Sequence, residues 1–280
     1  MKASHFIALA AAFAAESAVA QTALVGPGTS YASPFSPAGS VTHDVPGGGL
    51  LSITLSNGIT SGSFGYWDLM AQGGANISLL GLGLVESGAQ TSLTGSSLRF
   101  GVSNSLSSLV GALGTGTSLA FGWQATAWFD NPGGELGFIP QTSYQMSFDV
   151  NGNNGLLGSV LGVTPSFTFE LIDGAGNALD CDGSGTLINI AGLLGTGVTT
   201  GTVNLSYTTG TTAPDGPIGI RLSGSALLDA TAVGIGTEFA TVSNFTLNAN
   251  VVPEPGGMAL ILAAGLCGLA RRRRSLWTAV

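Results

Sequence analysis

Tyr144-Gln145-Met146-Ser147-Phe148-Asp149-Val150 is the stretch that decides the fold class, because apolar and polar residues alternate along it without interruption. Successive side chains of a β-strand point to opposite faces of a sheet, so a period of two predicts a strand with one buried face. Directly afterwards, Asn151-Gly152-Asn153-Asn154-Gly155 supplies residue types that favour turns. The stretch therefore predicts a half-buried strand that ends in a turn.

The same alternation recurs on both sides of this strand, and turn signals rich in Gly, Pro, Asn and Asp separate the runs. The 45 glycines weigh against long helices, because a glycine inside a helix costs about 1 kcal/mol relative to alanine. We therefore predict an all-β fold, an antiparallel two-sheet sandwich, over residues 21–251. The further alternating runs are 51–55, 123–129, 167–171, 203–207, 218–222 and 245–247.

Residues 70–118 fit this alternation less well. The segments 79–84 and 109–116 are apolar but interrupted by glycines, and 191–197 repeats the same character. We interpret these segments as packed loops or short edge strands. They are also candidates for self-association surfaces, since exposed apolar edges invite pairing with another chain.

The order of the predicted strands resembles the jelly-roll sandwiches common among carbohydrate-binding modules. Residues 144–150 resemble the central strand of such modules, 169–177 the next hairpin and 238–247 the closing strand, although an Asp usually stands where this chain has Ser243. The resemblance spans about residues 120–250 and implies a jelly-roll-like fold. It does not by itself supply a function.

The N-terminus has the three parts of a secretory signal peptide. Lys2 supplies the positive charge, residues 6–15 are apolar, and the small residues Ala18 and Ala20 precede Gln21. We predict that residues 1–20 are a signal peptide, cleaved between Ala20 and Gln21.

The C-terminal segment, residues 252–280, also has three parts: Pro253-Glu254-Pro255, an apolar run over 256–270, and four arginines. A helix of about 15 residues rises only about 22 Å, less than the roughly 30 Å of the hydrocarbon core. The basic cluster acts as a stop-transfer block on the cytoplasmic side. Its members are Arg271, Arg272, Arg273 and Arg274.

This arrangement resembles the PEP-CTERM sorting tail. The resemblance implies a short transmembrane sorting helix that anchors the chain transiently in the inner membrane until an exosortase cuts near Pro253-Glu254-Pro255. It also implies a cell-surface or extracellular destination, in the setting of exopolysaccharide and biofilm. The alternative is an ordinary single-span anchor that stays uncut.

The charge balance excludes one class of partner. Between the two end segments the chain has two arginines, Arg99 and Arg221, no lysine and thirteen acidic residues, a formal net charge of −11. Nucleic-acid binding needs clustered basic residues, so we expect no nucleic-acid partner. Neutral molecules, cations and polysaccharides remain compatible with this acidic composition.

Motifs for catalysis are sparse. His43 is the one histidine of the body and Cys181 its one cysteine, which leaves no histidine pair for zinc and no intramolecular disulfide. Paired carboxylates for glycoside hydrolysis would have to come from Glu86, Glu135, Glu170 or Glu238, and no spacing in the sequence indicates which two of them would converge. We expect a protein that is not an enzyme and needs no cofactor, with calcium as the one candidate ion.

The calcium candidate consists of Asp180, Asp182 and Ser184, at alternating positions before Gly185. This spacing resembles the start of an acidic calcium loop, but Ala191 stands where such a loop has its bidentate Glu. Asp149, Asn151 and Asn153 form a second cluster of this type. A plain turn is the favoured explanation of either cluster.

Aromatic residues are the candidates for sugar stacking. Tyr66 and Trp67 lie in a glycine-rich segment and are predicted to be at the surface, whereas Trp123 and Trp128 are predicted to pack in the core. Two functions therefore compete. One is a structural component of the envelope or matrix that self-associates, and the other is a carbohydrate-binding module that recognises extracellular polysaccharide.

Overall fold

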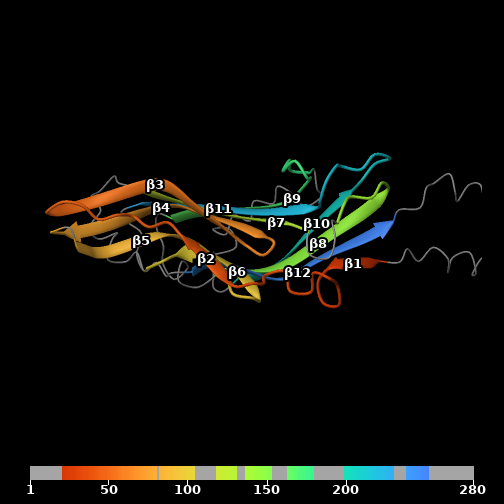
Figure 1. The fold of residues 1–280 in the computed structure, drawn as a ribbon, viewed down its shortest axis with the longest axis horizontal. Helices are drawn as coiled ribbons and strands as arrows, with labels where there is room; N and C mark the ends of the chain where they lie inside the picture. Colours follow the sequence, from red (N-terminus) through yellow and green to blue (C-terminus); the bar gives the residue numbers. More distant parts are fainter. Residues whose placement is uncertain are drawn as a thin grey trace, which may run out of the picture.

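The structure, a computed structural model, describes residues 21–80, 82–104, 118–130, 136–152, 163–179, 199–229 and 238–251. These residues form twelve β-strands and no helix (Figure 1). None of them belongs to a helix long and apolar enough to cross a membrane. The strands are β1 (Thr22–Val25), β2 (Gly39–Thr42), β3 (Leu51–Phe64), β4 (Trp67–Leu79), β5 (Leu82–Leu93), β6 (Ser97–Val102), β7 (Ser118–Trp128), β8 (Thr142–Gly152), β9 (Val163–Ile172), β10 (Thr199–Thr208), β11 (Gly219–Asp229) and β12 (Glu238–Val251).

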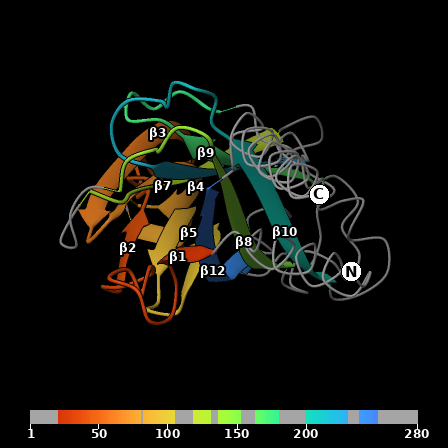
Figure 2. The same cartoon turned by 90° about the vertical axis from the view of Figure 1, so that its right-hand side faces the viewer.

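The strands form two antiparallel sheets. Sheet A contains β10, β8, β12, β6 and the second half of β5 in that order, with β1 added to β12 and β2 to β5. Sheet B contains the first half of β5, then β4, β7, β11 and β9, with β3 on the outer edge of β4. A view along the long axis places β3, β4 and β7 on one side of the molecule and β8, β10 and β12 on the other (Figure 2).

Strand β5 connects the two sheets. Its first half pairs with β4 as far as Gly88, and from Ala89 onward it pairs with β6. At the corner, the Ser103 amide donates to the Gly88 carbonyl at 2.9 Å and the His43 amide donates to the Ala89 carbonyl at 2.9 Å. The corner is therefore held by the end of β6 on one side and by the segment after β2 on the other.

The core lies between the sheets and is rich in aromatic rings. Trp123 of β7 is stacked on Phe167 of β9 with ring centroids 6.2 Å apart, and Phe239 of β12 meets it edge-on at 5.1 Å. On sheet A, Tyr144, Met146, Phe148 and Val150 all point inward and are buried. Their alternation in the sequence is therefore the direct cause of the buried face of β8.

The predicted antiparallel sandwich is confirmed over the described residues. The seven alternating runs fall in β3, β7, β8, β9, β10, β11 and β12, except that Phe129 directly follows β7 and Ile218 directly precedes β11. The segment 79–84 was interpreted as a packed loop or a short edge strand. It contains the turn between β4 and β5, but its two ends belong to long strands of 13 and 12 residues rather than to a short edge strand. The signal peptide (1–20) and the sorting tail (252–280) lie outside the described residues.

Candidate functional site: a polar pocket on sheet A

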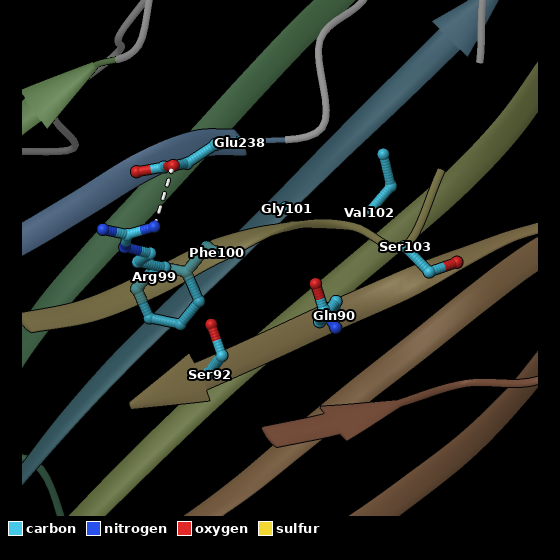
Figure 3. A pocket seen from close by; sticks show the side chains of 8 residues that line it. All are labelled: Gln90, Ser92, Arg99, Phe100, Gly101, Val102, Ser103 and Glu238. Atoms are coloured by element: carbon cyan, nitrogen blue, oxygen red, sulfur yellow. Dashed lines mark hydrogen bonds and ion pairs between the residues drawn. The ribbon is translucent and has the colours of Figure 1, made fainter. Parts of the chain in front are cut away.

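A polar pocket opens on the outer face of sheet A, across β5, β6 and β12 (Figure 3). Its volume is about 190 Å³. Phe100 and Val102 line it too, but their side chains are turned into the core and are buried. The side chains that present polar groups to the pocket are Gln90, Ser92, Arg99, Ser103 and Glu238.

The strand register explains why the face is hollow here. Gly101 of β6 lies opposite Glu238 of β12 on one side and opposite Gln90 of β5 on the other. In a sheet, residues in register present their side chains on the same face. Gly101 has no side chain, so the space between Glu238 and Gln90 stays open.

Arg99 and Glu238 form the charged part of the pocket. Arg99 Nη1 lies 3.5 Å from Glu238 Oε2, and the two side chains are 47% and 25% exposed. The hydroxyl of Thr241 donates to the other carboxylate oxygen, Oε1. Arg99 has further N–H donors and each Glu238 oxygen a further lone pair, so both groups keep hydrogen-bonding capacity for a ligand.

The core supports the floor of the pocket directly. The indole Nε1 of Trp123 donates a hydrogen bond of 2.7 Å to the carbonyl oxygen of Gly101. Trp123 belongs to sheet B and Gly101 to sheet A, so this bond fixes the distance between the sheets beneath the pocket. The position of the pocket therefore depends on a buried residue that a ligand would not touch.

The pocket continues into a wide polar surface over β10, β8 and β12. The outward positions of these strands carry short polar side chains in register, for example Thr202, Asp149 and Ser243 in one cross-strand row. No aromatic side chain occupies an outward position of β8 or β12. The outward residues include Ser143, Gln145, Ser147, Asp149, Asn151, Thr202, Asn204, Ser206, Thr208, Thr241, Ser243, Thr246, Asn248 and Asn250.

Asp149 is the acidic residue of this surface, and both its oxygens have partners. Asn244 Nδ2 donates to one oxygen and Thr202 Oγ1 to the other, each at 2.7 Å. These hydrogen bonds hold the pKa of Asp149 below its ordinary value, with the bond from Asn244 contributing most. Asn244 has a φ of 54° and lies where the register of β12 shifts, so Asp149 stabilises this irregularity.

The predicted stacking residues Tyr66 and Trp67 are not at the surface as expected. Trp67 is 1% exposed, its ring is stacked on Phe35, and its Nε1 donates to the Pro34 carbonyl. Tyr66 is half-buried and lies 5.2 Å from the ring of Tyr31. Trp67 therefore has no free face for a sugar ring, because the segment 31–37 before β2 covers it.

The structure places some of the other predicted residues, and the rest lie outside the described residues. Trp123 is in the core as predicted, whereas Trp128 is half-buried on the opposite side of β7. Asp180, Asp182, Ser184 and Cys181 lie outside the described residues. Within the part of the chain that the structure describes, no group of three His, Cys, Asp or Glu residues could hold a metal ion.

The candidate glutamates that the structure describes lie in separate environments, and Glu135 lies outside the described residues. Glu86 accepts a hydrogen bond from the Val45 amide, Glu170 pairs with Arg221 on the outer face of sheet B, and Glu238 lines the pocket on sheet A. His43 is buried, and its ring nitrogens contact the hydroxyls of Ser56 at 2.8 Å and Thr60 at 3.1 Å. These contacts give His43 a role in attaching the segment after β2 to β3.

From the sequence, Glu238 was only a candidate carboxylate and Arg99 only a charge, because no local pattern indicates that the two residues meet. Arg99 and Glu238 are 139 positions apart, and they meet only because β6 pairs with β12. The alternation in Ser97-Leu98-Arg99-Phe100 would place Arg99 on the polar face of a strand. It would not identify the strand beside it.

The comparisons with known proteins do not assign the chain to a family. No protein-family model and no curated protein matches the sequence. A cyclase from Fischerella sp. TAU in complex with 4-(1H-indol-3-yl)butan-2-one is similar, at 14% identity and a TM-score of 0.31, over 60% of this chain and 76% of the cyclase.

Solved structures of carbohydrate-binding modules are also similar. TmCBM61 in complex with β-1,4-galactotriose matches over 54% of this chain and 68% of that module, at 12% identity and a TM-score of 0.21. The CBM22-1 xylan-binding domain of Paenibacillus barcinonensis Xyn10C matches over 76% of this chain and 94% of the domain, at 12% identity and a TM-score of 0.21.

These comparisons correct one sequence-based expectation. We expected a protein that is not an enzyme, but the similar solved structures include cyclases, which are enzymes. The exclusion of enzymes is therefore withdrawn.

Proposed function

We propose that this chain is an exported envelope or matrix protein that binds a neutral extracellular polysaccharide through the polar pocket of sheet A. The observation that supports the proposal best is the pocket lining, which combines a donor-only group, Arg99, an acceptor-only group, Glu238, and the amide of Gln90. Sugar hydroxyls both donate and accept hydrogen bonds, so this set of groups matches them.

The size of the pocket and the net charge of the chain narrow the class of ligand. A volume of about 190 Å³ is below the roughly 300–1,000 Å³ of typical small-molecule sites, so one ring or side branch of a polymer would enter while its neighbours lie along the polar strands. The formal net charge of −11 between the end segments repels anionic polymers. A neutral polysaccharide is therefore favoured over an acidic one.

The test is calorimetric titration of the protein with the neutral exopolysaccharide of its source cells, with and without calcium. Arg99→Gln should weaken binding about tenfold or more, since a hydrogen bond to a charged group is worth about 1.5–3 kcal/mol. Arg221→Gln is the matched control, because Arg221 also forms an ion pair with a glutamate, Glu170, but on sheet B.

Equal binding by the Arg99→Gln variant, the Arg221→Gln variant and the wild type would contradict the pocket as the binding site. Absence of heat with the folded wild type would contradict polysaccharide binding itself. Binding that requires calcium would favour the predicted ion site at Asp180, Asp182 and Ser184.

The sorting tail is part of the same proposal. Its support is the motif in the sequence, Pro253-Glu254-Pro255 followed by an apolar run and four arginines. We expect an exosortase to cut near this motif and the body to reach the cell surface or the surrounding matrix. Replacing all three motif residues by alanine should leave the protein in the membrane fraction at higher mass; an unchanged mass and location would contradict exosortase processing.

A structural role in the matrix is the second candidate. It is favoured by an exposed apolar strand end on sheet B, which is a separate feature from the pocket.

A further inference from the structure

The end of sheet B formed by β3, β4 and β5 carries exposed aliphatic side chains, and we call residues 50–55 together with 77–82 the distal ribbon. Apart from Leu50, which directly precedes β3, the most exposed members of its apolar face are Leu51 at 73% and Leu82 at 71%. Leu51 lies opposite Leu79, and Leu79 lies opposite Leu82. The three leucines therefore form one cross-strand row on one face.

This face is the continuation of the core face. Leu69, Ala71 and Ala75 of β4 are buried between the sheets, and Ile77 and Leu79 follow at the same alternate positions. Figure 1 shows β3, β4 and β5 running out to one end of the molecule, past the strands of sheet A. The side chains are exposed because the facing sheet ends before the ribbon does.

The edge of the ribbon has no charged residue and no proline to prevent pairing, and the one irregularity of β3 lies beyond the ribbon, between Ser56 and Ile59. Among the described strands, β3 pairs with β4 alone, so no described strand pairs with its other edge. Natural edge strands are commonly protected by lysines, prolines or short length. β3 contains no charged residue and no proline.

We propose that the distal ribbon is a self-association surface, on which the edge of β3 and its apolar face meet those of a second copy of this chain. Charge is the reason for choosing a second copy. Residues 50–67 and 69–85 contain no charged side chain, although the chain as a whole is acidic. Two copies would repel each other over most of their surface but not here, and a two-fold contact places the same patch on both partners.

The available area fits such a contact. A specific interface buries about 800 Å² on each partner. Seven large aliphatic side chains that are between 43% and 77% exposed, together with the backbone edge of β3, offer an area of this order. They are Leu50, Leu51, Ile53, Leu55, Leu79, Leu80 and Leu82.

The test is sedimentation velocity of the full chain over a concentration series, with wild type, Ile53→Lys and Leu227→Lys. Ile53 and Leu227 are both 48% exposed, but Leu227 lies on β11, away from the ribbon. We expect the wild type and the Leu227→Lys variant to associate alike, and Ile53→Lys to weaken association at least about tenfold. All three chains share the same end segments, so any difference arises from the substituted strand.

A monomeric wild type would overturn the proposal, and so would equal association by all three proteins. Leu51→Lys changes a more exposed position of the same face. It should weaken association as well, and this measurement does not depend on the folding of the Ile53→Lys variant. A monomeric wild type that binds phosphatidylcholine vesicles, with binding lost in Ile53→Lys, would assign the ribbon to lipid instead.

Discussion

The Trp123→Ala variant should lose about 3–5 kcal/mol of unfolding free energy, the cost of removing a large buried aromatic side chain. Trp123 is 1% exposed, and its ring contacts Phe121, Phe167 and Phe239. Its loss also leaves the carbonyl of Gly101 without its indole donor. Domains are stable by only about 5–15 kcal/mol, so this is a large fraction of the total.

Urea denaturation followed by circular dichroism would measure the loss. In a thermal scan, each kcal/mol corresponds to about 2–4 °C in Tm for a domain of this size. Trp123→Phe keeps most of the ring packing but removes the hydrogen bond, so its unfolding free energy should fall by less. Trp128→Ala is the control on the same strand, where a half-buried ring should cost less. Equal losses at Trp123 and Trp128 would contradict the central place of Trp123 in the core.

The fold class could be predicted from local sequence, because apolar and polar residues alternate with a period of two along the strands. Residues 144–150 alternate cleanly because sheet A buries one face and exposes the other, and β8 spans Thr142–Gly152 around them. The same pattern was less informative over 70–118, since Gly73, Gly74 and Gly83 interrupt the apolar pattern of two long strands. A glycine contributes no apolar side chain to a pattern even where the backbone stays extended.

The site was less predictable than the fold, because it depends on which strands are neighbours. Trp67 was expected at the surface from its glycine-rich surroundings, but the segment 31–37 covers it, with Phe35 stacked on the ring. Conversely, Arg99 was considered from the sequence only for its contribution to the net charge. Its importance arises from the pairing of β6 with β12, and from Gly101, where a missing side chain makes the hollow.

The second large effect is expected at the corner of β5. Gly88→Ala should lower the unfolding free energy by about 3 kcal/mol or more, because a Cβ there would lie 1.6 Å from the carbonyl oxygen of His43. The obstacle is backbone, so no side-chain rotation relieves it. To make room, the segment after β2 must move, which breaks the hydrogen bond from the His43 amide to the Ala89 carbonyl.

Two other glycines separate this steric effect from the general consequences of replacing glycine. Gly48→Ala should change the unfolding free energy little, since its Cβ would meet no atom within 4 Å and its φ is unremarkable for alanine. Gly95 also has open space but a φ of +88°, so Gly95→Ala should cost about 1–2 kcal/mol through backbone strain. Urea unfolding of the three variants should therefore rank them Gly48, Gly95, Gly88 in order of increasing loss.

The same substitution tests how the corner and the pocket are connected. Gly88 exchanges two hydrogen bonds with Ser103, whose side chain lines the pocket. A Gly88→Ala variant that remains folded should therefore also bind polysaccharide more weakly, whereas Gly95→Ala should bind as the wild type does. If Gly88→Ala matched Gly48→Ala in stability, the segment after β2 would not lie against β5 as described, and the corner would have to be held in another way.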